Sequence, residues 1–145
     1  MFLTKNLTLD ELTVSQEAVR SGLPNKPTDA HILNLVSLCS TILQPLRDKV
    51  KKPLVVSSGF RSPSVNRRIG GSKSSQHTKG QAADFTIPGM SVADTVALIR
   101  RMGLPFDQLI NEGGAWVHVS IGPLNRGQVL MATFKDGSAT YKDIT

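Results

Sequence analysis

Two histidines and one aspartate have the residue types that could hold a metal ion for catalysis. His77 and Asp84 lie close together at the end of a segment rich in glycine, serine and arginine, and His118 lies in a later apolar run. A catalytic zinc ion commonly takes three imidazole or carboxylate ligands and leaves one position for water. Such a site activates water for the hydrolysis of an amide or an ester. The spacing alone leaves a second interpretation open, a buried histidine–aspartate pair that is hydrogen-bonded without a metal.

These candidate ligands are expected near the ends of predicted strands. Apolar, β-branched runs predict strands at 54–58, which should be central in the sheet, at 80–87 and at 116–121. The first candidate histidine ends the loop between the first two strands. Gly80 and two alanines follow it, and these small residues allow the backbone to fold tightly enough for that histidine and the aspartate to reach one ion.

The remaining pattern places helices in the first half of the chain and strands in the second. Capping residues and apolar positions spaced by three and four predict a helix from Thr28 to Val50, which Pro45 should kink or interrupt. Further predicted elements are two short helical turns ending at Gly22, a helix at 92–102, and strands at 106–110 and 129–134. This order predicts the α+β class, with a mostly antiparallel sheet and the N-terminal helices packed on one of its faces. Residues 1–145 are expected to form a single domain.

The charge of the chain favours an anionic partner. The 145 residues carry a formal net charge of +6, and the pI is about 9.8. The basic residues are scattered, no helix-turn-helix or zinc-finger spacing is present, and only one tryptophan and one tyrosine could stack on bases. We therefore expect no nucleic-acid partner, and an anionic bacterial cell wall or envelope suits the charge.

Cysteine usage and hydropathy exclude several further classes. The single cysteine, Cys39, lies in an apolar helical pattern, so an internal disulfide framework and a cysteine-rich zinc site are excluded. No apolar run is long enough to cross a bilayer, and residues 1–6 lack the basic and apolar regions of a Sec signal. We expect a protein without a membrane span that is made in the cytoplasm. His31, in the first turn of the long predicted helix, is expected to be exposed or to cap that helix.

Three motifs, in order along the chain, resemble those of a known family of zinc peptidases. They are Ser58-Gly59-Phe60-Arg61, Ser75-x-His77-x-x-Gly80-x-Ala82-x-Asp84 and Trp116-Val117-His118-Val119-Ser120. The family comprises zinc D-alanyl-D-alanine carboxypeptidases and peptidoglycan L-alanyl-D-glutamate endopeptidases, shares its fold with the Hedgehog signalling domain and includes many small phage endolysins. The resemblance covers residues 2–134 and implies the Hedgehog/DD-peptidase fold.

The resemblance also implies roles for individual residues. Zn²⁺ would be bound by three ligands, His77, Asp84 and His118. Arg61 would orient the substrate and stabilise the developing oxyanion, a role that suits its planar, permanently charged guanidinium group. Ser75 and Ser120 could donate hydrogen bonds to the substrate or to a ligand carboxylate, or could be structural serines in tight turns.

The general base is the position at which this sequence departs from several members of that family. Those members carry a glutamate three residues before the second metal-binding histidine, where this chain has Ala115. The nearest carboxylates belong to Glu112 and Asp107. Glu112 is the first choice, because Gly113 and Gly114 could let it fold back towards the reacting water. Asp107 is the alternative, and a solvated turn is the non-functional interpretation of Glu112.

Together these features predict a zinc-dependent peptidoglycan peptidase with the properties of a phage or prophage endolysin. Such a protein is expected to be a monomer in the host bacterial cytoplasm that reaches the periplasm or cell wall at lysis. A carboxypeptidase that removes terminal D-alanine is the first alternative. A non-catalytic, metal-stabilised cell-wall-binding module is the second, and a basic nucleic-acid binder is the third.

Overall fold

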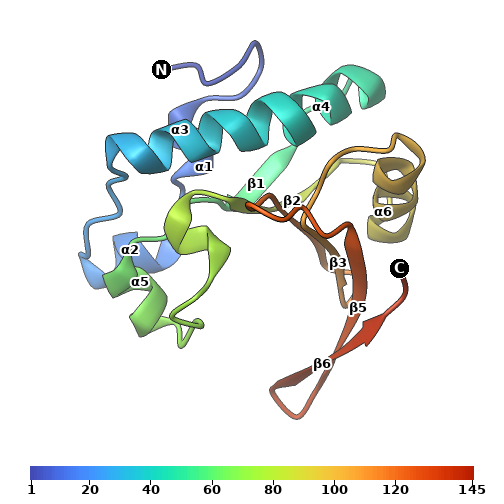
Figure 1. The fold of residues 1–145 in the computed structure, drawn as a ribbon. Helices are drawn as coiled ribbons and strands as arrows, with labels where there is room; N and C mark the ends of the chain where they lie inside the picture. The colour runs from blue at the N-terminus through green and yellow to red at the C-terminus, as the bar shows by residue number, and fades with distance from the viewer.

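The candidate ligands lie on or beside a six-stranded sheet. In the computed structural model, which describes residues 1–145, the strands lie in the order β1-β2-β4-β3-β5-β6 (Figure 1). Their bounds are Val55–Ser58 (β1), Ala82–Thr86 (β2), Gln108–Glu112 (β3), Trp116–Ser120 (β4), Gln128–Lys135 (β5) and Ser138–Asp143 (β6). Together with the helices described below, this sheet confirms the α+β class.

The sheet is mixed, which corrects the expectation of a mostly antiparallel sheet. β3 and β5 pair in parallel, and the other neighbouring strands pair antiparallel. The parallel pair arises because the end of β4 lies beside the start of β3, where the Asp107 N–H donates to the Ser120 oxygen at 2.8 Å. The short loop 121–127 returns the chain to that same end of β3, and its last residue, Gly127, donates to the oxygen of Phe106. β5 therefore starts where β3 starts and runs in the same direction.

The edges of the sheet also differ from the sequence-based prediction. The strand expected to be central is β1, which lies at one edge because it pairs only with β2. The opposite edge is β6, a strand that the prediction did not include. Asp136 and Gly137, with φ angles of 53° and 78°, form the two-residue turn between β5 and β6.

Most helices begin at a residue whose side chain caps their free N–H groups. The hydroxyl groups of Thr8, Ser15, Thr28 and Ser91 accept hydrogen bonds in the first turns of α1, α2, α3 and α6. The helices are α1 (Leu9–Leu12), α2 (Gln16–Ser21), α3 (Asp29–Leu38), the π-helical η1 (Cys39–Leu43), α4 (Gln44–Val50), α5 (Pro63–Arg68), the 3-10 helix η2 (Gln76–Lys79) and α6 (Val92–Arg101). α5 and η2 lie inside the segment predicted to be a loop. None of these helices combines the length and apolar character needed to span a membrane.

The long predicted helix is confirmed, with an interruption beside Pro45. α3 and α4 are joined by η1, at whose end the N–H of Gln44 donates to the oxygen of Cys39, five residues earlier. This wider turn lies directly before Pro45, whose ring cannot donate a backbone hydrogen bond. His31 accepts a hydrogen bond from the N–H of Thr28 through Nδ1, which confirms its expected capping role.

The two faces of the sheet have different surroundings because side chains alternate along each strand. One face contributes Phe85, Leu109 and Val117 to a hydrophobic core that also contains Leu38 of α3 and Ile99 of α6. The opposite face carries Asp84 of β2, Glu112 of β3 and His118 of β4. The chemistry of the protein is therefore confined to one side of the sheet.

Candidate metal centre and its cleft

His77 is held in place by a single helical turn, η2. Gly80 ends this turn with a φ of 74°, and a Cβ atom there would lie 2.6 Å from the backbone oxygen of His31, so glycine is required. His77 is buried, with 5% of the residue exposed, and its Nδ1–H donates to the backbone oxygen of Gly59 at 2.8 Å. This hydrogen bond selects the tautomer in which Nε2 is unprotonated and available as a metal ligand.

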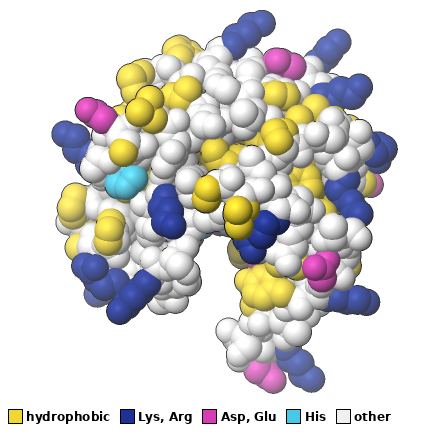
Figure 2. Space-filling view, viewed as in Figure 1, with side chains coloured by type: hydrophobic (Ala, Val, Ile, Leu, Met, Phe, Trp, Pro, Cys, Tyr) yellow, Lys and Arg dark blue, Asp and Glu magenta, His cyan; other side chains and the backbone are white.

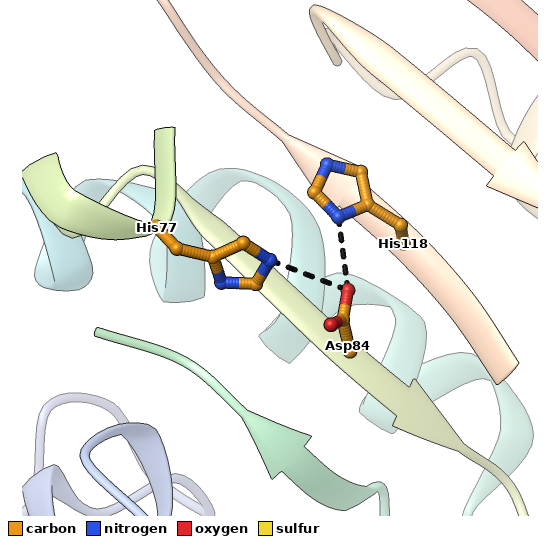
Figure 3. A group of neighbouring side chains, drawn as sticks. All are labelled: His77, Asp84 and His118. Carbon is orange, nitrogen blue, oxygen red and sulfur yellow. Dashed lines mark hydrogen bonds and ion pairs between the residues drawn. The ribbon is translucent and has the colours of Figure 1, made fainter. Parts of the chain in front are cut away.

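Asp84 and His118 face each other across β2 and β4. They are direct partners in the antiparallel register, so their side chains lie on the same face. Nδ1 of His118 lies 2.9 Å from Oδ1 of Asp84, and Nε2 of His77 lies 3.4 Å from the same oxygen (Figure 3). One potential ligand atom from each residue lies within 4.8 Å of the other two. The structure thus brings His118 to His77 and Asp84, although it lies 34 residues beyond Asp84 in the chain.

This group has the chemistry of a zinc site. Two imidazole nitrogens and one carboxylate oxygen form a common ligand set of catalytic zinc, which leaves a further position open. Burial raises the pKa of Asp84, but the hydrogen bonds from His118 and His77 outweigh it and hold that pKa well below its usual range. The carboxylate is consequently ionised at neutral pH, as a metal ligand must be.

Glu112 ends β3 beside this group. It pairs with Trp116, and Ile110, two residues earlier on the same face, pairs with His118. The side chain is buried, with 8% of the residue exposed. Burial raises the pKa of Glu112, the neighbouring His118 opposes this rise, and the negative charge of Asp84 adds to it. Glu112 is therefore a buried carboxyl group that feels the charges of two of the candidate ligands.

Arg61 reaches the same cleft from the loop after β1. Its Nη1 donates to Oδ1 of Asn66 at 2.9 Å, and Nδ2 of Asn66 donates to the backbone oxygen of Ser72. A Cβ atom at Gly71 would lie 3.0 Å from Arg61 Nη1 and closer still to Asn66. Burial lowers the pKa of Arg61, and the charge of Asp84 opposes this shift. The guanidinium group is thus positioned by a buried amide and lies within the field of a candidate ligand.

Asp107 occupies a different environment from Glu112. Its carboxylate accepts hydrogen bonds from Nε and Nη2 of Arg126 at 2.8 and 3.0 Å, and from Nε2 of Gln76 at 2.8 Å. The bonds from Arg126 come first among the causes that hold the pKa of Asp107 well below its usual range. Asp107 does not line the cleft. It connects η2, which carries His77, to the loop after β4.

The two serines proposed for substrate binding lie in different places. Ser75 lines the cleft, and its Oγ accepts a hydrogen bond from the N–H of His77 at 3.3 Å. Ser120 is fully buried, and its Oγ accepts a hydrogen bond from the N–H of Gln108 at 3.1 Å. The structure therefore places Ser75 where a substrate could reach it and Ser120 in the support of β3 and β4.

The candidate metal centre forms the floor of a cleft with a volume of about 900 Å³. Figure 2 shows the molecule hollowed between the part that contains α2 and α5 and the β5–β6 hairpin. One side, here called the polar wall, is the segment 61–79, with Arg61, Ser72, Ser74, Ser75, Gln76 and Lys79 in the cleft. The other side, here called the aromatic wall, consists of Trp116, Leu130, Phe134 and Tyr141.

The sequence-based prediction did not include several residues that support or line the cleft. Asn66, Gln76 and Arg126 act through hydrogen bonds to other side chains, and no motif in the sequence marks such contacts. The hairpin that carries most of the aromatic wall could have been predicted from the sequence. Asp136-Gly137, between two segments in which apolar and polar residues alternate, is typical of a β-hairpin turn.

Comparison with known proteins gives one family. A family model described as Peptidase M15 matches residues 5–120. The matched range contains the three candidate ligands together with Arg61 and Glu112, and it ends before β5. A search of the curated proteins gives no match.

Proposed function

The chain belongs to the peptidase M15 family of zinc peptidases, and from this premise we propose that it hydrolyses an amide bond in the peptide of bacterial peptidoglycan. His77, Asp84 and His118 would hold the zinc ion. When bound, zinc supplies Lewis-acid chemistry, which polarises a carbonyl group and lowers the pKa of water. The protein's own side chains then have to supply a base, a counter-charge for the oxyanion and a surface for the substrate.

Glu112 is proposed as the general base that takes the proton of the attacking water. Burial raises its pKa, which makes its carboxylate a stronger proton acceptor than an exposed one. After attack, the same carboxyl group would return the proton to the leaving amine. Arg61, held by Asn66, would donate hydrogen bonds to the oxygen on which negative charge develops.

One observation carries this proposal: a buried carboxyl group outside the ligand set lies in the same cleft as the three candidate ligands. Glu112 and the ligands all line that cleft, whereas the carboxylate of Asp107 is already paired with Arg126. A binding module with a purely structural metal has no need of a further buried carboxyl group. The arrangement therefore favours hydrolysis over the non-catalytic alternative.

The cleft also bears on the choice between an endopeptidase and a carboxypeptidase. The cleft, with a volume of about 900 Å³, lies between two walls and can accommodate several residues of an extended peptide. We therefore favour cleavage within the wall peptide and keep removal of a terminal D-alanine as the second candidate. The net charge of +6 supports an anionic wall as the partner. Action as a phage endolysin, as a monomer released from the host cytoplasm at lysis, is the biological role that we propose for this activity.

Digestion of purified peptidoglycan, followed by mass spectrometry of the fragments, tests the proposal and identifies the bond. The zinc-loaded protein should release wall peptides, and a chelator should abolish that release. Glu112→Gln should retain zinc and lose activity by roughly 100-fold or more. Glu17→Gln, on the surface of α2, is the matched control and should behave as the parent. Intact peptidoglycan after treatment with a protein of full zinc content would overturn the enzymatic function.

A further inference from the structure

The β5–β6 hairpin extends beyond the rest of the sheet. The last residue pair between β3 and β5 is Glu112 with Ala132, whereas β5 and β6 continue to pair as far as Lys135 with Ser138. The tip of the hairpin, residues 133–140, therefore pairs with no other strand and projects from the body of the molecule (Figure 1). It also lies outside the range matched by the family model. A two-stranded ribbon of this kind contributes little to the core, so its aromatic residues need another explanation.

Phe134 is fixed on one side although it lies on this projecting ribbon. Its ring lies 6.0 Å from the ring of Trp116, centroid to centroid, at an angle of 32°. A Cβ atom at Gly113 would lie 2.8 Å from the Phe134 ring, so the turn after β3 has no side chain at the point where the ring approaches it. The residue is nevertheless 51% exposed and lines the cleft. A ring that is fixed on one side and open on the other is suited to contact a ligand.

Tyr141 completes this surface from β6. It pairs with Ala132, which brings its ring to the same face as Phe134, and it is 52% exposed in the cleft. Partial burial raises the pKa of Tyr141, and the negative charges of Glu112 and Asp84 raise it further. Ala132, the partner of Tyr141 on β5, pairs in turn with Glu112 on β3, so the aromatic wall lies on the same face of the sheet as the proposed base.

Position and charge identify the part of the substrate that this wall would meet. Groups beside the reacting amide of a peptide substrate contact the amino acids that flank the bond. The aromatic wall contains no charged side chain. Arg61 and Lys79 lie on the polar wall, and Arg126, which also lines the cleft, is paired with Asp107. An uncharged, aliphatic side chain is therefore the expected neighbour of the aromatic wall, and the carboxylate groups of the peptide are expected to face the polar wall.

We propose that the β5–β6 hairpin is the specificity-determining wall of the cleft, with Phe134 and Tyr141 contacting the aliphatic side chain of a residue next to the scissile amide. This inference rests on the proposed peptidase function. It assigns selection of the substrate to a ribbon outside the family-matched range and leaves the chemistry to the ligands, Glu112 and Arg61.

Hydrolysis of paired synthetic wall peptides tests this assignment. The peptides of a pair differ by a single methyl group, alanine or glycine, at one of the two positions that flank the scissile bond. The zinc-loaded parent should prefer alanine over glycine by roughly 10-fold in kcat/KM at one of these positions. Phe134→Ala should reduce this preference to less than about 2-fold, mainly through KM, and Tyr141→Ala should weaken it. Thr133→Ala, on the opposite face of the ribbon, is the control and should keep the parental preference.

Binding provides a second measurement that does not depend on turnover. Trp116 is the single tryptophan of the chain, so its fluorescence reports on the aromatic wall. In zinc-loaded Glu112→Gln, the alanine peptide should bind roughly 10-fold more tightly than the glycine peptide, and adding Phe134→Ala should remove this difference. Phe134→Leu keeps an apolar side chain against Gly113 and should fold if the alanine variant does not; it should lower the preference by an intermediate amount.

The outcomes separate the two hypotheses. Failure of the zinc-loaded parent to cleave any wall peptide would overturn the proposed function, and the fluorescence titration would still decide the role of the hairpin. Cleavage by the parent with an alanine preference that Phe134→Ala leaves unchanged would overturn the hairpin assignment alone. Equal binding of the two peptides to zinc-loaded Glu112→Gln would overturn it as well.

Discussion

The polar wall and the aromatic wall face each other across one metal centre but are held in place by different forces. In the polar wall, buried amides and carboxylates fix the functional groups: Asn66 holds Arg61, and Asp107 holds Gln76 beside His77. In the aromatic wall, strand pairing and ring packing do so, and the residues that face the cleft remain half exposed.

This difference indicates how the geometry of the reacting groups can stay constant while the selectivity for the substrate changes. Hydrogen bonds to buried charged groups are directional, so a change in one partner disturbs the geometry of the reacting groups. Contacts with an exposed aromatic ring depend mainly on area, and replacement of the ring changes affinity more than chemistry. We therefore expect variants of the polar wall to affect metal binding, kcat and folding, and variants of the aromatic wall to affect KM.

The largest effect is expected from the loss of a metal ligand in the polar wall. His77→Ala should lower the affinity for zinc by more than roughly 100-fold, because one of three ligands is removed. Zinc content after dialysis against a weak chelator measures this change. His31→Ala, which removes a capping histidine, and Phe134→Ala, which removes a ring of the aromatic wall, should both retain the metal. Equal zinc loss from all three variants would contradict the division between the walls.

A second large effect is expected in the rate of the chemical step. Arg61→Lys should lower kcat by roughly 100-fold and change KM little, since a lysine cannot bond to Asn66 and to the developing oxyanion with the same planar geometry. Steady-state kinetics with a soluble wall peptide measure both constants. Arg67→Lys, on the exposed side of α5, makes the same chemical change outside the cleft and should behave as the parent. An unchanged kcat in Arg61→Lys would remove the proposed role of this residue.

The ligand group could be predicted from the sequence because its motifs are local. The Ser75 to Asp84 segment and the Trp116 to Ser120 segment each contain their own turn or strand signals, and the alternation of side chains along β4 places His118 opposite the core. The order of the strands in the sheet was harder to predict from the sequence. The short loop 121–127, which steps from β4 to the far side of β3, decides the mixed sheet, and its length alone does not say which edge the next strand joins.

The supporting contacts could not be predicted, for a related reason. Asp107 is a candidate base by sequence proximity to Glu112, and only the fold shows that its carboxylate faces Arg126 and Gln76. Conversely, the hairpin tip was predictable from Asp136-Gly137, since this dipeptide favours the positive φ angles of a tight turn. Long-range hydrogen bonds between side chains carry no periodic signal, whereas turns do.

An effect of intermediate size is expected from replacing Asp107, and it concerns the stability of the fold and its dependence on pH. Asp107→Asn should lower the free energy of unfolding at pH 7 by roughly 2 kcal/mol, because charge-assisted hydrogen bonds to a buried carboxylate are lost. The folded-state pKa of Asp107 is depressed, so its stabilising contribution is present above the unfolded-state pKa and is lost as the pH falls through the folded-state pKa. The difference between parent and variant should therefore shrink below about pH 4.

Urea unfolding of the metal-free proteins at pH 7 and at pH 3 measures this difference. Asp143→Asn provides the counterpart at the end of the hairpin, where Asp143 accepts hydrogen bonds from Thr145 and its pKa is also lowered by them. Because Asp143 is exposed, its replacement should change stability much less. A destabilisation by Asp107→Asn that is the same at both pH values would show that the ionised carboxylate is not what stabilises the polar wall.

The smallest effect is expected from the turn of the hairpin. Gly137 has a φ of 78°, so Gly137→Ala should cost about 1 kcal/mol in the turn. Because the tip pairs only with itself, this cost should appear as faster hydrogen exchange of the amides at 133–140 with little change elsewhere. If the aromatic wall selects the substrate, KM for the wall peptide should rise a few-fold while kcat and zinc content stay constant.

Gly103→Ala separates this effect from general destabilisation. Gly103 follows α6 and has a φ of 65°, and a Cβ atom there would meet no other atom within 4 Å, so alanine carries a similar backbone cost far from the cleft. It should reduce global stability and leave KM unchanged, because nothing in the aromatic wall depends on it. An equal rise in KM in both variants would mean that the hairpin affects the substrate only through overall stability, and the contrast between the two walls would then be one of position and not of function.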